Sequence, residues 1–131
     1  MKPFLDTNVL VYSVLSDDPR RERAEAALLA GGVVSVQVMN EFANVARRKL
    51  GWDWPAVEAA LDLIERQCRP VRPLSLATHR TAIGVSRDHG LSIYDGLIVA
   101  AALEAGCDRL LTEDLQAGRS FGALVVTNPF A

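Results

Sequence analysis

The sequence has few cysteines and no long hydrophobic run, and each shortage excludes a class of protein. Its two cysteines, Cys68 and Cys107, have neither metal-ligand spacing nor neighbouring histidines. They therefore predict buried free thiols, not a metal site. No apolar run reaches the length of a membrane span. The N-terminus also lacks the basic start and the cleavage site of a signal peptide, so we expect a cytoplasmic protein that does not enter a membrane.

Basic residues are sparse as well. The net charge is −2 and the pI is about 5.6, which argues against non-specific binding to nucleic acid. Only Lys2 and Lys49 are lysines, and the arginines gather in short clusters within residues 20–23, 47–48 and 66–72. Each cluster is either a solvated helix face or part of a phosphate-binding rim around an acidic centre.

The signatures of several enzyme classes are missing. The sequence contains no GxSxG nucleophile elbow, no Walker loop and no Cys–His pair. A receiver-type domain would need a lysine after a late strand, and neither lysine is placed there. His79 and His89 have no ligand-spaced neighbours, so we expect both to be structural. These absences leave the carboxylates as the main candidates for chemistry.

The length and composition favour one globular domain over residues 1–131. Half of the 131 residues are hydrophobic and 23% are charged, enough for a single core. Short strands are predicted at 4–5, 33–36, 109–112 and 123–126, with an edge strand at 71–74. Helices are predicted between them, one of them beginning at Pro19 with Asp18 as its cap. This alternation predicts an α/β fold with a parallel sheet of four or five strands and helices on both faces.

The stretch from residue 91 to 115 is predicted to be a helix, a glycine stop, a strand and then two acids. Ser92 is a good N-cap, and Asp95 lies at capping-box spacing from it. Gly106 ends the helix, and Glu113 and Asp114 follow the strand. Ligands of open α/β sheets bind outside the carboxyl ends of the strands, so we expect acids of this stretch to face that crevice.

Two further acids are predicted at the same edge of the sheet. Asp6 ends the first strand, although it is also placed to cap the following helix. Glu41 lies within the apolar stripe of a helix predicted over residues 37–50. A carboxylate there is costly unless it is paired, hydrogen-bonded or bound to a metal, and an internal salt bridge to an arginine is the alternative.

Carboxylates that converge from separate elements repel one another unless they are neutralised. No histidine or lysine is placed to do so, and a divalent cation with oxygen ligands, Mg²⁺ or Mn²⁺, is the economical answer. Such a site activates water for phosphodiester hydrolysis. Side chains that would orient the acids are Thr7, Asn8 and Thr112. The predicted catalytic and metal-binding residues are Asp6, Glu41, Asp95 and Asp114.

The sequence resembles PIN-domain proteins, and specifically the VapC-type toxins of type II toxin–antitoxin pairs. The matching stretches are FLDTNVLVY at 4–12, SVQVMNEFANVARRK at 35–49, LSIYDGLIVAAALEAGC at 91–107 and LLTEDL at 110–115. The resemblance implies a PIN-like three-layer α/β/α fold, with a short, mostly parallel sheet of four or five strands flanked by helices. It also implies a Mg²⁺- or Mn²⁺-dependent endoribonuclease that leaves a 5′-phosphate and a 3′-hydroxyl. Within the acidic quartet named above, it implies that Asp6 and Asp95 are the most consistent metal contacts.

The resemblance also implies a homodimer, inhibited by a small antitoxin that covers the site and binds operator DNA. Two positions bear on the match. Gly96 stands where alanine is usual, which should be tolerated in the first turn of a helix. Glu113 is the alternative to Asp114 as the fourth acid, and position in the motif favours Asp114.

Alternatives to a ribonuclease toxin are a nuclease of the same chemistry that acts on DNA or structured flaps, and a catalytically silent module that binds a partner. Short length favours RNA only weakly, while the complete acidic set argues against a silent module. The neighbouring tryptophans, Trp52 and Trp54, also have two interpretations. They form a base-stacking platform, or they pin a helix–helix corner or cover a partner surface.

Overall fold

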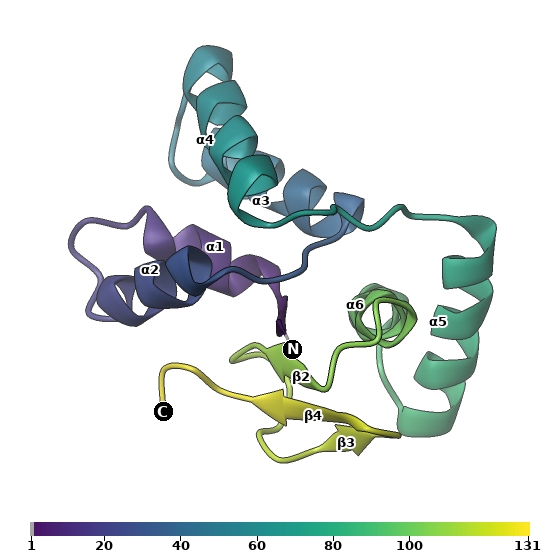
Figure 1. The fold of residues 1–131 in the computed structure, drawn as a ribbon. Helices are drawn as coiled ribbons and strands as arrows, with labels where there is room; N and C mark the ends of the chain where they lie inside the picture. Colours follow the sequence, from purple (N-terminus) through teal and green to yellow (C-terminus); the bar gives the residue numbers. More distant parts are fainter. Residues whose placement is uncertain (1) are drawn as a thin grey trace.

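The computed structural model describes residues 2–131, and its strands form one mixed sheet (Figure 1). The strand order is β1-β2-β4-β3, in which β1, β2 and β4 are parallel and β3 is antiparallel to β4. The strands are β1 (Phe4–Leu5), β2 (Arg109–Leu111), β3 (Ser120–Phe121) and β4 (Leu124–Thr127). The helices are α1 (Thr7–Ser13), α2 (Arg21–Ala30), α3 (Val36–Arg48), α4 (Trp54–Gln67), α5 (Leu76–His89) and α6 (Ile93–Glu104).

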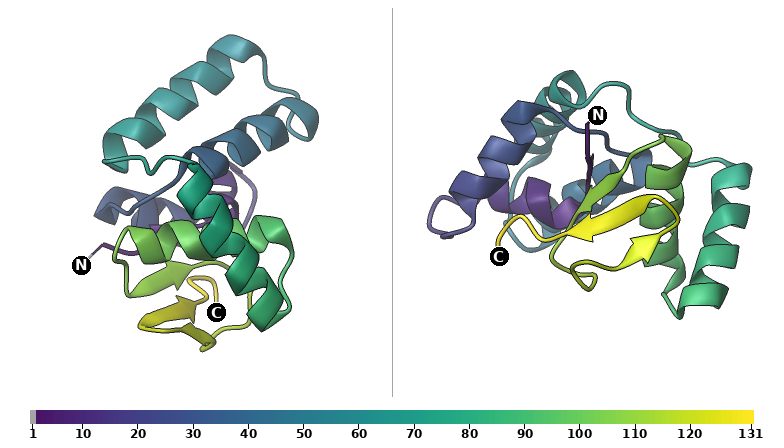
Figure 2. Two further views of the ribbon diagram at one scale, coloured as in Figure 1. Left: turned by 90° about the vertical axis from the view of Figure 1, so that its right-hand side faces the viewer. Right: turned by 60° about the horizontal axis from the view of Figure 1, so that its bottom comes forward.

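Helices lie on both sides of the sheet, which confirms the predicted three-layer α/β/α arrangement. In Figure 1, α1 and α2 lie to one side, and α5 and α6 lie to the other. Helices α3 and α4 form a helical hairpin that projects away from β3 and β4 (Figures 1 and 2). Among residues 2–131, no helix is both long and apolar enough to cross a membrane.

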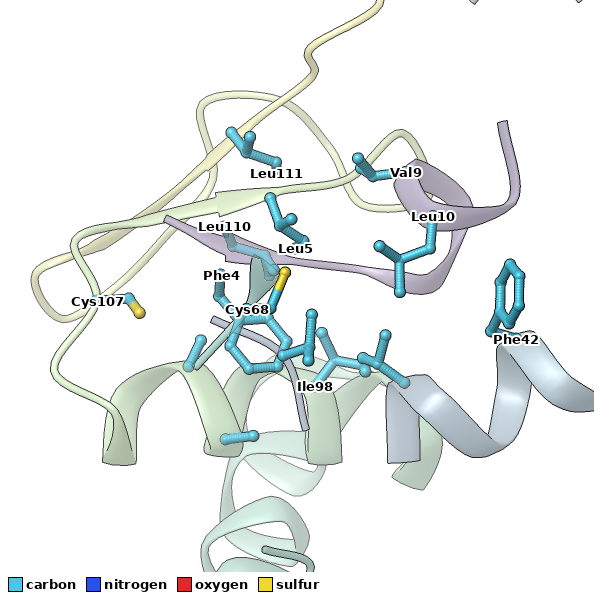
Figure 3. Close-up of a cluster of buried hydrophobic side chains, with 14 of the residues drawn as sticks. Phe4, Leu5, Val9, Leu10, Phe42, Cys68, Ile98, Cys107, Leu110 and Leu111 are labelled. Atoms are coloured by element: carbon cyan, nitrogen blue, oxygen red, sulfur yellow. The ribbon is translucent and has the colours of Figure 1, made fainter. Parts of the chain in front are cut away.

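Helix α6 is the most buried helix of the fold. Its run from Ile98 to Ala102 is buried, because α5 covers one side of it and the strands cover the other. Figure 3 shows Phe4 and Cys68 above Ile98 in this core, whereas Leu111 lies on the opposite side of the strands. Cys68 and Cys107 are both buried free thiols, as the sequence predicted.

Gly96 is required by the close packing of α5 on α6. A Cβ atom at this position would lie 2.8 Å from the carbonyl oxygen of Ala82 and would collide with the hydroxyl of Ser86. Glycine at this position is therefore tolerated, as predicted. The reason is the close contact with α5, and not its place in the first turn. The glycine allows the backbone of α6 to approach α5 directly after Asp95.

Capping side chains explain why most helices begin where they do. Ser92 accepts a hydrogen bond from the backbone N–H of Asp95, as the capping-box spacing predicted, and Gly90 ends α5 in the left-handed conformation. The other helices that begin with a side-chain cap do so at Asp6, Ser35, Asp53 and Ser75.

The strands predicted at 33–36 and 71–74 are not strands in the structure. Val33 forms a single parallel bridge to Phe4, and Ser35 forms one to Arg72. The side chain of Ser35 then caps α3, whose first residue is Val36. Helix α3 therefore begins before the β-branched run has formed more than two isolated bridges.

Two other predictions about elements need correction. Helix α2 begins at Arg21, not Pro19, because the carboxylate of Asp18 bonds the backbone and guanidinium of Arg20 instead of capping a helix. The sequence reading also missed β3, which folds back on β4 through a turn in which Gly122 has a φ of 62°. The sheet is still mostly parallel, as expected, because only the β3–β4 pair is antiparallel.

Candidate active site

The first strands end together and bring two acidic segments side by side. The backbone N–H of Asp6, directly after β1, donates to the carbonyl of Leu111 at the end of β2 over 3.0 Å. Thr112 and Asp114 follow Leu111, so they lie beside the first turn of α1. This is the carboxyl edge of the parallel strands, where the sequence placed the crevice.

Asp6 is both a helix cap and a member of the acidic cluster. One of its carboxylate oxygens accepts from the N–H of Thr7 over 2.7 Å, and the other accepts from the hydroxyl of Thr112 over 2.8 Å. Only 5% of Asp6 is exposed. The two interpretations of this residue are compatible, because a cap at this helix start also faces the end of β2.

Glu41 on α3 is held by hydrogen bonds and not by an arginine. Its two oxygens accept from the hydroxyl of Thr7 over 3.0 Å and from the side-chain amide of Gln37 over 2.6 Å. The same Gln37 amide donates to the carbonyl of Tyr94 over 3.1 Å, which joins α3 to the start of α6. This bond brings the segment that carries Asp95 next to Glu41.

Asp114 is held by Asn8 and by its own neighbour Thr112. The side-chain amide of Asn8 donates to both Asp114 and Thr112 over 3.1 Å, and the N–H of Asp114 donates to the Thr112 hydroxyl over 3.0 Å. Three side chains that the sequence offered as orienting groups, Thr7, Asn8 and Thr112, therefore each bond an acid of the cluster.

Glu113 faces away from these acids. Its carboxylate accepts from the hydroxyl of Tyr12 and from Arg20 at 3.3 Å. Arg20 also pairs with Asp18 at 2.8 Å, and its guanidinium carbon lies 3.7 Å from the centre of the Tyr12 ring. Glu113 thus belongs to an arginine-centred network, while its neighbour Asp114 stays with the acidic cluster.

The cluster is electrostatically unfavourable without an added cation. The pKa of Asp6 is raised to about 6, chiefly by burial and also by the charges of Asp114 and Glu41, against the opposing effect of its hydrogen bonds. Burial also raises the pKa of Asp95, and the same two neighbours add to this. Within residues 2–131, no ion pair involves any of the four acids.

The donor set suits a hard divalent cation, although the acids do not form a finished cage. No three Asp, Glu, His or Cys side chains of the described chain are grouped so that they could hold a metal. Mg²⁺ usually keeps several waters and binds only one or two carboxylates directly. Two further oxygens are buried without a hydrogen-bond partner, Oδ1 of Asn8 and Oε1 of Gln37, and both amides bond acids of the cluster.

Two hollows meet at Glu41. One of about 370 Å³ lies between α1 and α3 and reaches Asp114, and one of about 310 Å³ reaches Tyr94 and Leu97 on α6. A substrate that crosses the cluster would therefore lie along α3. Sequence reasoning missed Gln37, although its position four residues before Glu41 is a usable signal, because residues four apart are neighbours on a helix.

Comparisons with known proteins identify the family and the fold. The family model that matches is the PIN domain, over residues 4–119. A toxin–antitoxin complex from Klebsiella pneumoniae is similar in structure, with a TM-score of 0.73, 18% identity and 98% of each chain covered. VapBC2 from Rickettsia felis, bound to a promoter DNA fragment, has a TM-score of 0.69, 18% identity and the same coverage.

A third solved structure is VapC20 of Mycobacterium tuberculosis, a toxin that cleaves the sarcin-ricin loop. It has a TM-score of 0.69 and 20% identity, with 83% of this chain and 87% of that chain covered. Among curated proteins there is no significant match. Identities this low establish the shared fold, while the family match spans most of the sequence. The chain belongs to the PIN domain family.

Proposed function

We propose that the protein is a Mg²⁺- or Mn²⁺-dependent endoribonuclease and the toxin of a toxin–antitoxin pair. The observation that carries the proposal is the convergence of four acids from four separate elements, with no ion pair to a cation of the described chain. The similarity to VapC20, a toxin that cleaves the sarcin-ricin loop, supports RNA as the substrate class. A ribonuclease that acts on cellular RNA would work in the cytoplasm.

The residues of this chain have distinct tasks in the proposed reaction. Asp6, Glu41 and Asp114 are each fixed by the hydrogen bonds described above, so they hold their carboxylates in place before substrate arrives. Asp95 is only partly buried and has no such anchor on its carboxylate from another element. Because its carboxylate is free to turn within the site, we assign Asp95 to contact the ion together with Asp6 and to accept a hydrogen bond from the attacking water.

A bound Mg²⁺ or Mn²⁺ would lower the pKa of that water and stabilise the negative charge that develops on the phosphate. Asp6 is the most buried of the acids and lies where the two strands end, so it would hold the ion most rigidly. The hydroxyl of Thr112, which bonds Asp6 and also accepts from Asp114 and Asn8, keeps these groups in one arrangement.

The test is cleavage of labelled oligonucleotides. Purified protein with Mn²⁺ should cut a single-stranded RNA, and chelation with EDTA should stop the reaction. A DNA strand of the same sequence should be cut much more slowly. Faster cutting of DNA or of a flap would show that the alternative nuclease function is correct, and no cleavage of any nucleic acid with either ion would contradict the proposal.

We further propose that the protein binds a small antitoxin and forms a homodimer. Two structural relatives are a toxin–antitoxin complex and VapBC2 bound to promoter DNA, and we expect this chain to contact operator DNA only through its antitoxin. Leu74 and Tyr94 are exposed apolar residues on the rim of one hollow and are candidates for such contacts. Sedimentation of the protein alone, and with the product of an adjacent small gene, tests both proposals.

A further inference from the structure

The two tryptophans of the α3–α4 corner have different environments. Trp52 is half-buried, and its ring stands edge-on to Phe42 with the ring centres 6.2 Å apart. Its backbone N–H donates to the carbonyl of Ala46. Trp54, the first residue of α4, is 57% exposed. The corner is therefore pinned by Trp52, and Trp54 is left with an open ring face that this packing does not use.

One basic group lies over the exposed tryptophan, and a second lines the same hollow. The guanidinium carbon of Arg47 lies 4.7 Å from the centre of the Trp54 ring, and a nitrogen of the same group donates to the carbonyl of Trp52 over 2.8 Å. Neither Arg47 nor Arg48 is in an ion pair with another residue of the described chain. Asp53, the nearest acid in sequence, is turned to the N–H of Ala56. The local charge is therefore positive in a protein of net charge −2.

These residues line a hollow that continues toward the acidic cluster. A hollow of about 560 Å³ contains Trp54, Arg47 and Arg48, together with two amide side chains, Asn40 and Asn44. The same two amides line the hollow of about 310 Å³ that reaches Glu41. Positions 40, 44 and 47 share one face of α3, because they are four and three residues apart. One face of α3 thus connects the exposed tryptophan with the acids.

We propose that Trp54 stacks an unpaired base of the RNA substrate beyond the cleavage site, with Arg47 and Arg48 on the flanking phosphates. Stacking on an aromatic ring combined with a basic groove is how proteins bind single-stranded nucleic acid. Among residues 2–131, no carboxylate lines the hollow around Trp54, so the charge of this hollow complements a phosphate backbone. The proposal rests on the proposed ribonuclease function, since it names a second binding position for the same substrate.

The proposal is tested by binding, measured apart from cleavage. The Asp95→Asn variant serves as a non-cleaving background, and the probe is a short single-stranded RNA of mixed sequence with a fluorescein label, in the presence of Mg²⁺. Added Trp54→Ala should weaken binding at least about fivefold, while Trp54→Phe should retain most of the affinity. Leu63→Ala is the matched control, because it also removes an exposed apolar side chain from α4.

Arg47→Gln provides a second readout. It should weaken binding and reduce the dependence of affinity on salt by about the contribution of one phosphate contact. The proposal is wrong if Trp54→Ala binds RNA within twofold of the background, and equally wrong if it weakens only binding to a partner protein. Failure of the parent protein to cleave any RNA would instead contradict the proposed function, so the two failures are distinguishable.

Discussion

Glu113 and Asp114 are adjacent in the sequence, yet they belong to two acidic clusters of opposite character. Glu113 shares Arg20 with Asp18, and Tyr12 completes that network. Asp114 joins the other three candidate acids, none of which is in an ion pair within residues 2–131. The chain supplies the first cluster with a cation of its own, Arg20. The second keeps its like charges together, and this difference indicates which of the two needs a cation from solution.

The two clusters also shift pKa values in opposite directions. Hydrogen bonds from Arg20 lower the pKa of Asp18 to about 2. Burial, chiefly, raises the pKa of Asp6 to about 6. A carboxylate with a lowered pKa stabilises the fold when it is ionised, and one with a raised pKa destabilises it. The acidic cluster of Asp6 therefore carries a stability cost that a bound cation would offset.

The largest effect should come from removing an acid of the unpaired cluster. We expect Asp6→Ala and Asp95→Asn to reduce RNA cleavage by at least about a hundredfold while the circular dichroism spectrum is unchanged, because both acids would hold the ion or the attacking water. The control is Asp108→Asn, an exposed acid before β2, at the opposite end of that strand from Asp114. Retained cleavage in Asp6→Ala would contradict the claim that the cluster without ion pairs carries the activity.

The second prediction concerns the stability of the metal-free protein against pH. Between pH 3.8, the ordinary pKa of an aspartate, and about 6, the Asp6 carboxyl takes up protons more readily in the folded than in the unfolded chain. Its contribution to the free energy of unfolding should therefore be lost as the pH rises through this range, by up to about 3 kcal/mol. Urea unfolding in EDTA should show this fall in the free energy of unfolding with rising pH in the wild type. The fall should be smaller in Asp6→Asn.

The paired cluster should behave in the reverse manner at lower pH. Asp18 stabilises the fold above pH 3.8, the ordinary pKa of an aspartate, and this contribution should disappear as the pH falls toward its lowered pKa of about 2. In Asp18→Asn, the free energy of unfolding should therefore fall less at acidic pH than it does in the wild type. The change that comes from Asp6 between pH 3.8 and about 6 should be the same in both proteins. If the free energy of unfolding had the same pH dependence in Asp6→Asn and Asp18→Asn, this would contradict the contrast between the two clusters.

The fourth prediction concerns the packing that brings α6, and with it Asp95, to the unpaired cluster. Gly96→Ala should lower the free energy of unfolding by about 1–3 kcal/mol, because the added methyl meets the carbonyl oxygen of Ala82 on α5. Gly84→Ala is the matched control, since the nearest atom to its Cβ is a guanidinium nitrogen of Arg87 at 3.8 Å. It should be neutral or stabilising, and equal losses in both variants would show that the close approach is unimportant.

The smallest effect should come from the paired cluster. Glu113→Gln removes one partner of Arg20, which keeps Asp18, and the pair is partly exposed. We expect the midpoint of thermal unfolding to fall by a few degrees at most. Cleavage should decrease far less than in Asp6→Ala. A loss of cleavage as large as that of Asp6→Ala would instead identify Glu113 as the fourth acid.

The helices and the convergence of the acids could be predicted from sequence, because each acid stands at a junction that local patterns mark. Asp6 and Asp114 follow apolar strands, and Asp95 follows the cap at Ser92. Parallel strands then bring such junctions to one edge. The family match over residues 4–119 confirms the fold that these patterns and the resemblance indicated.

What could not be predicted depends on contacts between distant parts of the chain. The direction in which Glu113 points is decided by Arg20, and nothing near residue 113 in the sequence identifies that partner. The run at 33–36 has strand composition, but Ser35 caps α3 and ends the pairing. The close approach of α5 at Gly96 likewise becomes visible only when both helices are in place.

The central claim is that the unpaired acids bind a divalent cation, and calorimetric titration of the metal-free protein with Mn²⁺ tests it most directly. Near neutral pH we expect saturable binding that weakens as the pH falls below about 6, where Asp6 takes up a proton, and that is lost in Asp6→Ala. No binding heat in the wild type, or equal binding in Asp6→Ala, would contradict the claim.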